Sequence, residues 1–256
     1  MTDVIAIKVP GTNFTYLHRC GPNHAFVVDP GNAAPVQEAL AAHHLSLAAV
    51  LVTHHHWDHV GGAADLQRKA HCELIGAGPT LIPTPDRTVA DGDALAIEEV
   101  ALQVIATPGH TRNSVCYYIP GRPGGPGIVY TGDTLFVGGC GRLLEGEART
   151  MWQSLQRLAA LPDETLVYCG HDYALENYEF AAALAPSHRR IRERLAEIQR
   201  TIEYDLPAIP STIGQEKATN IFLQADDPQI RAALGLAEAR PEEVFAELRS
   251  RKDLFG

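Results

Sequence analysis

Several features that mark particular classes of protein are missing from this sequence of 256 residues. No apolar run approaches the ~18 residues that a membrane-spanning helix needs, so we expect no membrane partner. Residues 1–7 contain neither a basic leader nor a long apolar stretch, which argues against a signal peptide. The five cysteines are odd in number, scattered and without a C-x-x-C pair, which predicts reduced thiols and a cytoplasmic protein.

Basic charge is also scarce. The chain has 21 Lys and Arg against 31 Asp and Glu, and its net charge is −10. Nucleic acid is therefore not the expected partner, since phosphate binding needs a basic surface, although a local basic patch could still bind a small anion. With 45% hydrophobic and 20% charged residues, the composition is that of an ordinary globular protein. We expect a monomer.

Short apolar runs separated by Gly and Pro predict an α/β first half. The predicted strands are residues 4–9, 14–17, 25–28, 47–52, 72–76, two within 95–107, 115–119, 128–131 and 166–169. Helical spacing predicts helices at 35–44, 63–70 and 148–160, and after residue 171 at 175–184, 188–204 and 241–251. The Pro- and Gly-rich stretch 120–127 must be a surface loop. The pattern indicates an α/β core with a helical C-terminal part.

The strand predicted at residues 47–52 runs into an unusual cluster of polar residues. His54, His56, Asp58 and His59 follow the pattern H-x-H-x-D-H. Alternate residues of a strand point the same way, so His54 and His56 can converge on one ion. If the chain then turns towards a helix, Asp58 and His59 can face a neighbouring point. This segment predicts two metal ions side by side.

Three further polar residues follow predicted strands or turns, and each comes directly after a glycine. They are His110, Asp133 and His171. Glycine allows the sharp turns and the close backbone approach that a crowded site requires. Residues that arrive from separate strand ends can meet at one edge of a sheet sandwich, so we expect these three to complete the site.

The donors can be assigned to two ions by their chemistry. The first metal would be bound by three neutral imidazoles and a carboxylate, namely His54, His56, His110 and Asp133. The second would be bound by Asp58, His59, His171 and the same Asp133, because a carboxylate can bridge with its two oxygens. Such ligands suit Zn²⁺ best, with Fe or Mn as alternatives. Two ions ~3.5–4 Å apart can share a hydroxide by lowering the pKa of bound water to about 7.

Other candidate residues have simpler interpretations. His55 and Trp57 alternate away from the cluster, so we expect them to pack behind the site. Asp29 is interpreted as a turn cap, and Cys140 and Cys169 as buried thiols. The remaining histidines are expected to be ordinary core or surface residues: His18, His24, His43, His44, His71 and His188.

These motifs, in this order, resemble the metallo-β-lactamase superfamily. Within it the chain is similar to glyoxalase II, the hydroxyacylglutathione hydrolases, on the strength of residues 131–142, 167–173 and 248–253. The resemblance implies a four-layer αββα sandwich over residues 1–172. It also implies a C-terminal helical domain that binds substrate over residues 173–256, and it implies the binuclear site assigned above.

The resemblance further implies how glutathione would be bound. The implied contacts are Arg142, Tyr173, Arg249 and Lys252, together with the position of Leu144. Arg and Lys pair readily with the carboxylates of glutathione. The family usually has an aromatic residue where this chain has Leu144, and an arginine where it has Gln224. Both departures bear on glutathione binding, and neither touches the metal ligands.

The implied reaction is hydrolysis of S-(2-hydroxyacyl)glutathione, typified by S-D-lactoylglutathione, to glutathione and a 2-hydroxy acid such as D-lactate. This is the second step of methylglyoxal detoxification. The metal-bridging hydroxide would attack the thioester, and Asp58 would orient it.

The main alternative is a mononuclear iron persulfide dioxygenase of the same superfamily. A β-lactamase, a ribonuclease and a metal-binding scaffold without catalysis are further alternatives.

Overall fold

The computed structural model describes residues 3–9, 11, 13–78 and 83–255. The chain divides into two compact units. Unit 1 comprises Met1–Ala106 and Asn113–Gly132, and unit 2 comprises Thr107–Arg112 and Asp133–Gly256. The short segment at residues 107–112, which contains His110, thus belongs with the C-terminal part of the chain.

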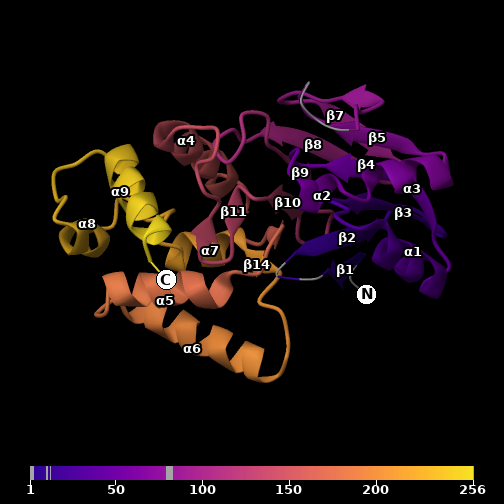
Figure 1. The fold of residues 1–256 in the computed structure, drawn as a ribbon. Helices are drawn as coiled ribbons and strands as arrows, with labels where there is room; N and C mark the ends of the chain where they lie inside the picture. Colours follow the sequence, from indigo (N-terminus) through magenta and orange to yellow (C-terminus); the bar gives the residue numbers. More distant parts are fainter. Residues whose placement is uncertain (1–2, 10, 12, 79–82, 256) are drawn as a thin grey trace. The chain divides into compact units, whose positions relative to one another are not determined.

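Unit 1 begins with a mixed six-stranded sheet in sequence order (Figure 1). Its strands are β1 Val4–Lys8, β2 Phe14–Arg19, β3 His24–Val28, β4 Ser46–Val52, β5 Glu73–Gly76 and β6 Arg87–Thr88. The first three strands are antiparallel, and β3 to β6 run parallel. The five strands predicted in this region are confirmed, and β6 is an addition. Because β3 and β4 are parallel neighbours, the residues that follow them emerge at the same edge of the sheet.

Helices cover one face of this sheet (Figure 1). They are α1 Ala33–Ala42, α2 Trp57–Val60 and α3 Ala63–Ala70. Asn32 caps α1, because its side chain accepts a hydrogen bond from the backbone N–H of Ala34 at 3.0 Å. Alternate strand residues such as Val27 and Val50 pack against Val36 of α1 in one hydrophobic core. This packing holds the strand ends that carry the histidine cluster.

The other face of the first sheet packs against a second, antiparallel set of strands in unit 1. These strands are β7 Ala94–Ile97, β8 Val100–Ala106, β9 Val115–Ile119 and β10 Ile128–Gly132, paired in the order β10-β9-β8-β7. The ring of Tyr130 lies 5.6 Å from that of Tyr16 and 6.4 Å from that of Phe26. Tyr117 donates a hydrogen bond from its hydroxyl to the carbonyl of Val52 at 2.9 Å. This bond fixes the last residue of β4, just before the histidine cluster.

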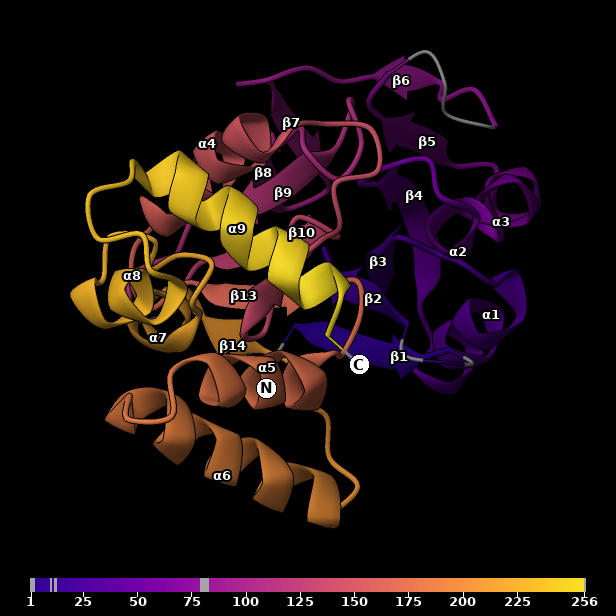
Figure 2. The same ribbon diagram turned by 60° about the vertical axis from the view of Figure 1, so that its left-hand side comes forward.

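Unit 2 is mainly helical, as predicted for the C-terminal part (Figure 2). Its helices are α4 Ala148–Ala159, α5 Ala174–Leu184, α6 Arg189–Glu203, α7 Ile213–Thr219, α8 Pro228–Leu234 and α9 Pro241–Asp253. The hairpin of β11 Leu135–Phe136 and β12 Gly139–Cys140 and the pair of β13 Leu166–Cys169 and β14 Ser211–Thr212 complete it. Phe245 of α9 packs against α4 and against the segment after α7, since its ring centre lies 5.9 Å from that of Trp152 and 6.1 Å from that of Phe222.

A buried glutamate ties α7 to the β11–β12 hairpin. Glu216 accepts hydrogen bonds from the backbone N–H of Gly138 at 2.8 Å, from the Ser211 hydroxyl at 2.5 Å and from the Asn220 amide at 3.0 Å. Burial raises the pKa of Glu216, while these donors oppose that shift. The network fixes the hairpin that directly follows Asp133.

Across the described residues, no helix is both long and apolar enough to cross a lipid bilayer.

Candidate metal centre

The histidine cluster of unit 1 begins immediately after β4. Nε2 of His54 and Nδ1 of His56 lie 3.0 Å apart, so the two imidazoles converge as their spacing predicts. The ring of His59 lies 4.1 Å from that of His54, measured between centroids. His54 and His59 are buried, and His56 is partly buried. The cluster therefore presents several imidazole nitrogens at one point at the end of a buried strand.

Asp58 and His59 lie in the short helix α2, whose N-cap is His56. The nearest carboxylate oxygen of Asp58 is 3.7 Å from Nε2 of His59. His59 is buried, whereas about half of the Asp58 side chain is exposed. The turn from strand into helix that the sequence predicts is thus present, and it places a carboxylate beside a second imidazole.

Asp29 belongs to this cluster, and its interpretation as a turn cap was wrong. One carboxylate oxygen accepts the backbone N–H of Thr53 at 2.7 Å. The other accepts the Thr53 hydroxyl at 2.7 Å and lies 3.0 Å from Nδ1 of His59. Asp29 follows β3, the parallel neighbour of β4, and it is only 3% exposed. It orients a candidate metal ligand, as buried carboxylates commonly do behind ligating histidines.

Unit 2 contributes the other three candidate ligands, and they also converge. Oδ2 of Asp133 lies 3.5 Å from Nε2 of His110 and 3.4 Å from Nε2 of His171. All three side chains are buried. Nδ1 of His110 lies 2.9 Å from the carbonyl oxygen of Arg142, which can accept a hydrogen bond only, so Nδ1 carries the proton and Nε2 faces Asp133. One carboxylate oxygen thus stands between two imidazole nitrogens.

Glycines make room around these ligands at two positions. Gly109, just before His110, has a φ of 150°, and a Cβ there would come within 2.7 Å of the Cβ of Met151. Gly132, just before Asp133, has a φ of 47°, and a Cβ there would collide with the Thr53 hydroxyl. Both positions require glycine for conformation and for space, as predicted from the sequence.

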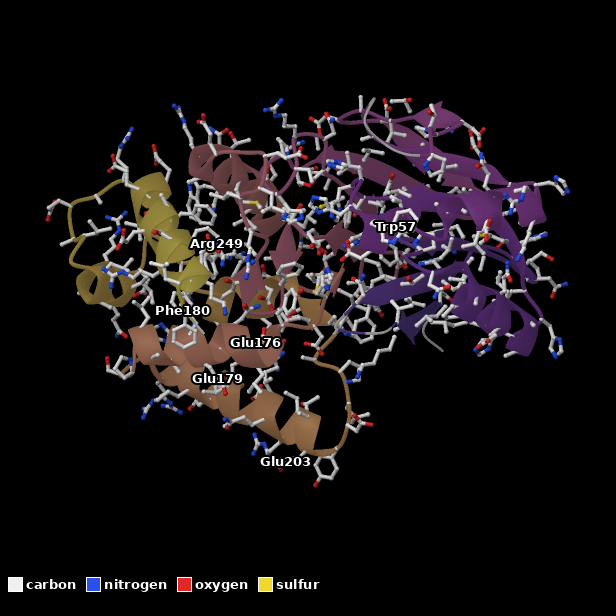
Figure 3. All side chains as sticks on the ribbon, viewed as in Figure 1. Trp57, Glu176, Glu179, Phe180, Glu203 and Arg249 are labelled. Carbon is white, nitrogen blue, oxygen red and sulfur yellow. The ribbon has the colours of Figure 1, made fainter. Side chains whose placement is uncertain are left out.

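Three basic residues predicted to contact substrate lie together in unit 2, around Asp253. Arg249 donates to Oδ1 of Asp253 at 2.8 Å, and Arg142 lies 3.9 Å from the same oxygen. Arg249 is 5% exposed and also donates to the carbonyl of Cys140 at 2.8 Å (Figure 3). The neighbouring Lys252 donates to the carbonyl of Glu176 at 3.3 Å. Arg249 therefore anchors the end of β12, while Arg142 has an exposed side chain.

The surroundings of Lys252 are partly apolar and partly cationic. Its ammonium nitrogen lies 5.8 Å from the ring centre of Phe180 and 5.5 Å from that of Phe255. Burial lowers the pKa of Lys252, Glu176 opposes this effect, and the charges of Arg249 and Arg142 add to the lowering. A bound anion at this place would relieve the repulsion among the cations.

The other predicted substrate positions are separate from this group. Tyr173 stacks on His171, with ring centres 5.0 Å apart and an interplanar angle of 10°. Leu144 is 60% exposed. Gln224 donates to the carbonyl of Lys217 at 3.2 Å. Tyr173 is thus in direct contact with a candidate metal ligand, and Leu144 leaves an apolar side chain on the surface.

The two cysteines and the tryptophan close to the site in sequence differ in their burial. Cys140 and Cys169 are buried, as predicted, and burial raises the pKa of Cys140 to about 11. The expectation that Trp57 packs behind the site was wrong, because its side chain is 78% exposed (Figure 3). The strand alternation ends at Val52, and Trp57 instead opens α2 on its solvent side. His55 is only partly buried.

The donors in both units fit a divalent metal. They are imidazole nitrogens and carboxylate oxygens without a thiolate, which suits a borderline ion such as Zn²⁺ and also Fe or Mn. In unit 1 the donor atoms of Asp29, His54 and His59 all lie within 4.8 Å of one another, and in unit 2 one oxygen of Asp133 lies within 3.5 Å of both His110 and His171. The donor chemistry thus supports a divalent metal centre without selecting the metal.

Comparison with known proteins identifies the family. A model described as metallo-beta-lactamase superfamily matches residues 9–171, and one described as hydroxyacylglutathione hydrolase C-terminus matches residues 172–255. A hydroxyacylglutathione hydrolase of Aeromonas salmonicida is 44% identical over 264 residues, covering 100% of both chains. This chain belongs to the hydroxyacylglutathione hydrolase family. A relative of the same name from Brucella anthropi is 47% identical and covers 89% of this chain and 87% of its own.

Solved structures share the fold of this chain. ETHE1 from Myxococcus xanthus superposes with a TM-score of 0.66 at 25% identity, and 99% of each chain is covered. TTHA1623, solved in a di-iron-bound form, superposes with a TM-score of 0.61 at 26% identity, covering 85% of this chain and 98% of its own. The predicted metallo-β-lactamase fold with a C-terminal helical region is confirmed, as is the prediction of a metal-dependent hydrolase.

Proposed function

We propose that this hydroxyacylglutathione hydrolase cleaves the thioester bond of S-(2-hydroxyacyl)glutathione, with S-D-lactoylglutathione as the typical substrate. The products are glutathione and a 2-hydroxy acid, D-lactate in the typical case. The observation that carries the proposal is the position of Asp133, whose Oδ2 lies within 3.5 Å of both His110 and His171. A carboxylate so placed in this family is suited to bridge two ions.

Two divalent ions would be bound by seven side chains, with Zn²⁺ the first expectation and Fe or Mn the alternatives. The first ion would take His54, His56, His110 and Asp133, and the second Asp58, His59, His171 and Asp133. That the donors of both units serve the same ions is supported by the order of the motifs and by family membership. Inside unit 1, the 3.0 Å approach of His54 to His56 supports their assignment to one ion, and inside unit 2 the place of Asp133 beside both His110 and His171 supports its assignment as the bridge.

When bound, such ions lower the pKa of water to about 7 and act as Lewis acids towards a carbonyl oxygen. The residues of the chain prepare the site for this chemistry. Asp29 and the carbonyl of Arg142 hold Nδ1 of His59 and His110, which leaves each Nε2 lone pair available. Asp58 would orient the water and accept its proton while the water oxygen forms a bond to the thioester carbon. The C–S bond would then break, glutathione would leave as its thiolate, and the thiolate would take up the proton held by Asp58.

The basic residues of unit 2 would bind the glutathione peptide. Arg142 and Lys252 would pair with its carboxylates, and Tyr173 would contact the substrate beside His171. Arg249 donates hydrogen bonds to Asp253 and to the Cys140 carbonyl, so we propose that it holds this basic surface in place. Leu144 offers an apolar contact where the family usually has an aromatic ring.

A comparison of thioesters tests the substrate assignment. Steady-state hydrolysis is measured for S-D-lactoylglutathione and for the D-lactoyl thioester of a thiol without the peptide. We expect a kcat/KM at least about tenfold higher for the glutathione thioester, in line with the loss of one or two charged contacts. Equal values would contradict the assignment. One iron per chain with oxygen uptake on glutathione persulfide would instead support the dioxygenase.

A further inference from the structure

The hydroxyl of Thr53 lies between a buried carboxylate and a candidate metal ligand. Its Oγ1 is 2.7 Å from Oδ2 of Asp29 and 3.0 Å from Nδ1 of His54. Thr53 is 1% exposed, Asp29 3% and His54 2%. The same Asp29 oxygen lies 3.0 Å from Nδ1 of His59. One carboxylate thus reaches two histidines, one directly and the other through Thr53.

The proton positions in this chain follow from what each group can donate. A carboxylate only accepts, so the Thr53 hydroxyl donates its proton to Asp29. The oxygen of Thr53 then has only lone pairs to offer His54. Nδ1 of His54 must therefore carry the proton, and the lone pair is placed on Nε2, the nitrogen that lies 3.0 Å from His56. A hydroxyl with the opposite orientation would leave Asp29 without this donor.

The main chain holds the Thr53 hydroxyl in this place. The N–H of Thr53 donates to Oδ1 of Asp29 at 2.7 Å, and its carbonyl accepts from the N–H of Val115 at 2.9 Å. Gly132 packs against the hydroxyl so closely that a Cβ on the glycine would overlap it. The two main-chain hydrogen bonds thus hold the backbone of Thr53, while Asp29 and Gly132 confine its hydroxyl beside His54.

We propose that Thr53 is a positioning residue that sets the tautomer of His54 and couples it to Asp29. The inference rests on the proposed function, since it takes His54 as a metal ligand. Asp29 would then serve both ions, the second through His59 and the first through the Thr53 hydroxyl. Removal of the hydroxyl should weaken the binding of one ion and leave the binding of the other unchanged. A general loss of packing would not produce this pattern.

The test compares Thr53→Ser, which keeps the hydroxyl, with Thr53→Ala, which removes it. Thr15→Ala is a matched control, because Thr15 is a buried threonine that donates to Asp29 as well, but to its main-chain carbonyl at 2.8 Å. Two readouts are used. Nitrogen-15 NMR of the metal-free protein reports which nitrogen of His54 carries the proton, and chelator competition with Zn²⁺ reports the affinity of each site.

We expect wild type, Thr53→Ser and Thr15→Ala to hold His54 with the proton on Nδ1. In Thr53→Ala the tautomer with the proton on Nδ1 should no longer be the main form. The affinity for one of the two ions should fall about 10- to 100-fold, as is typical when a group that orients a metal ligand is removed. If Thr53→Ala fails to fold, Thr53→Val makes the same comparison with the side-chain shape retained.

An unchanged tautomer and unchanged affinities in the variants without the hydroxyl would overturn the inference. Failure of the wild type to bind two ions would refute the proposed metal centre instead. The tautomer measurement on the metal-free protein would still decide the part played by Thr53.

Discussion

Oδ2 of Asp29 lies 3.0 Å from Nδ1 of His59, although the two residues are 30 positions apart in the sequence. The contact exists because β3 and β4 are parallel neighbours, so that the residues after both strands meet at one sheet edge. It links the end of β3 to helix α2. A candidate metal ligand is thereby oriented by the first sheet of the fold.

Asp29→Asn should lower both stability and metal binding. The amide would place N–H groups against the Thr53 hydroxyl or Nδ1 of His59, where the carboxylate now accepts. A hydrogen bond to a charged group is worth about 1.5–3 kcal/mol, so we expect a loss of about 2–3 kcal/mol in the free energy of unfolding. Urea unfolding of the metal-free protein measures it. A change below about 0.5 kcal/mol would show that Asp29 is not an anchor of this edge.

Asp133→Ala should abolish metal binding and hydrolysis together. Its carboxylate is the only group assigned to both ions, and it stands beside His110 and His171. Asp163→Ala is the control, because Asp163 pairs with Lys217 at the surface and such pairs contribute little. Metal analysis and a thioesterase assay on the same samples check the prediction. Full turnover by Asp133→Ala after metal removal would contradict the role assigned to the carboxylate.

His18 should make the metal-free protein less stable as the pH falls. It is buried beside Tyr130, with Nδ1 2.7 Å from the tyrosine hydroxyl, and burial lowers its pKa from 6.5 to about 4. Asp3 opposes this shift, and Arg122 adds to it. The unfolded chain takes up the proton first, so stability is unaffected above pH 6.5 and declines as the pH drops towards 4.

The loss attributable to His18 should reach about 3 kcal/mol near pH 4, from about 1.4 kcal/mol for each unit between the two pKa values. The check is chemical denaturation of wild type and His18→Gln between pH 7 and 4. The variant should be less stable at pH 7, and the difference from wild type should narrow as the pH falls. Parallel pH profiles would be inconsistent with a buried neutral His18.

Lys252→Met should raise KM for S-D-lactoylglutathione with little change in kcat. The ammonium group lies among Phe180, Phe255 and two arginines, so a substrate carboxylate would gain a partly desolvated cation there. We expect an increase of about 5- to 20-fold, which corresponds to about 1–2 kcal/mol.

Lys217→Met, at an exposed lysine that pairs with Asp163, is the matched control and should leave KM unchanged. Thioesters without the glutathione peptide should be hydrolysed equally well by Lys252→Met and wild type. If Lys252→Met slows both kinds of thioester alike, Lys252 supports the structure of the site and does not bind the peptide.

Those parts of the fold that depend on local pattern could be predicted from the sequence. The convergence of His54 and His56 follows from two residues at alternate positions after a buried strand, and the long helices follow from apolar spacing. Helices α7 and α8 and the β11–β12 hairpin were not predicted, because helices of seven residues and strands of two residues carry too little periodicity to identify.

Asp29 and Trp57 were misjudged from the sequence for different reasons. Asp29 stands in a Val-Asp-Pro-Gly turn that would suit a simple cap, and only the parallel pairing of β3 with β4 reveals its partners. Trp57 was misplaced because strand alternation was extended beyond Val52, where β4 ends, whereas Trp57 is the first residue of helix α2. The burial of Arg249 could not be predicted either, because its guanidinium donates to the carbonyl of Cys140, 109 residues away.

The most direct test of the two-metal thioesterase is a titration of metal-free protein with Zn²⁺, following hydrolysis of S-D-lactoylglutathione at each addition. We expect negligible activity without metal and a rise that stops at two ions per chain. Full activity in the metal-free protein, or a plateau at one ion that a second does not change, would contradict it.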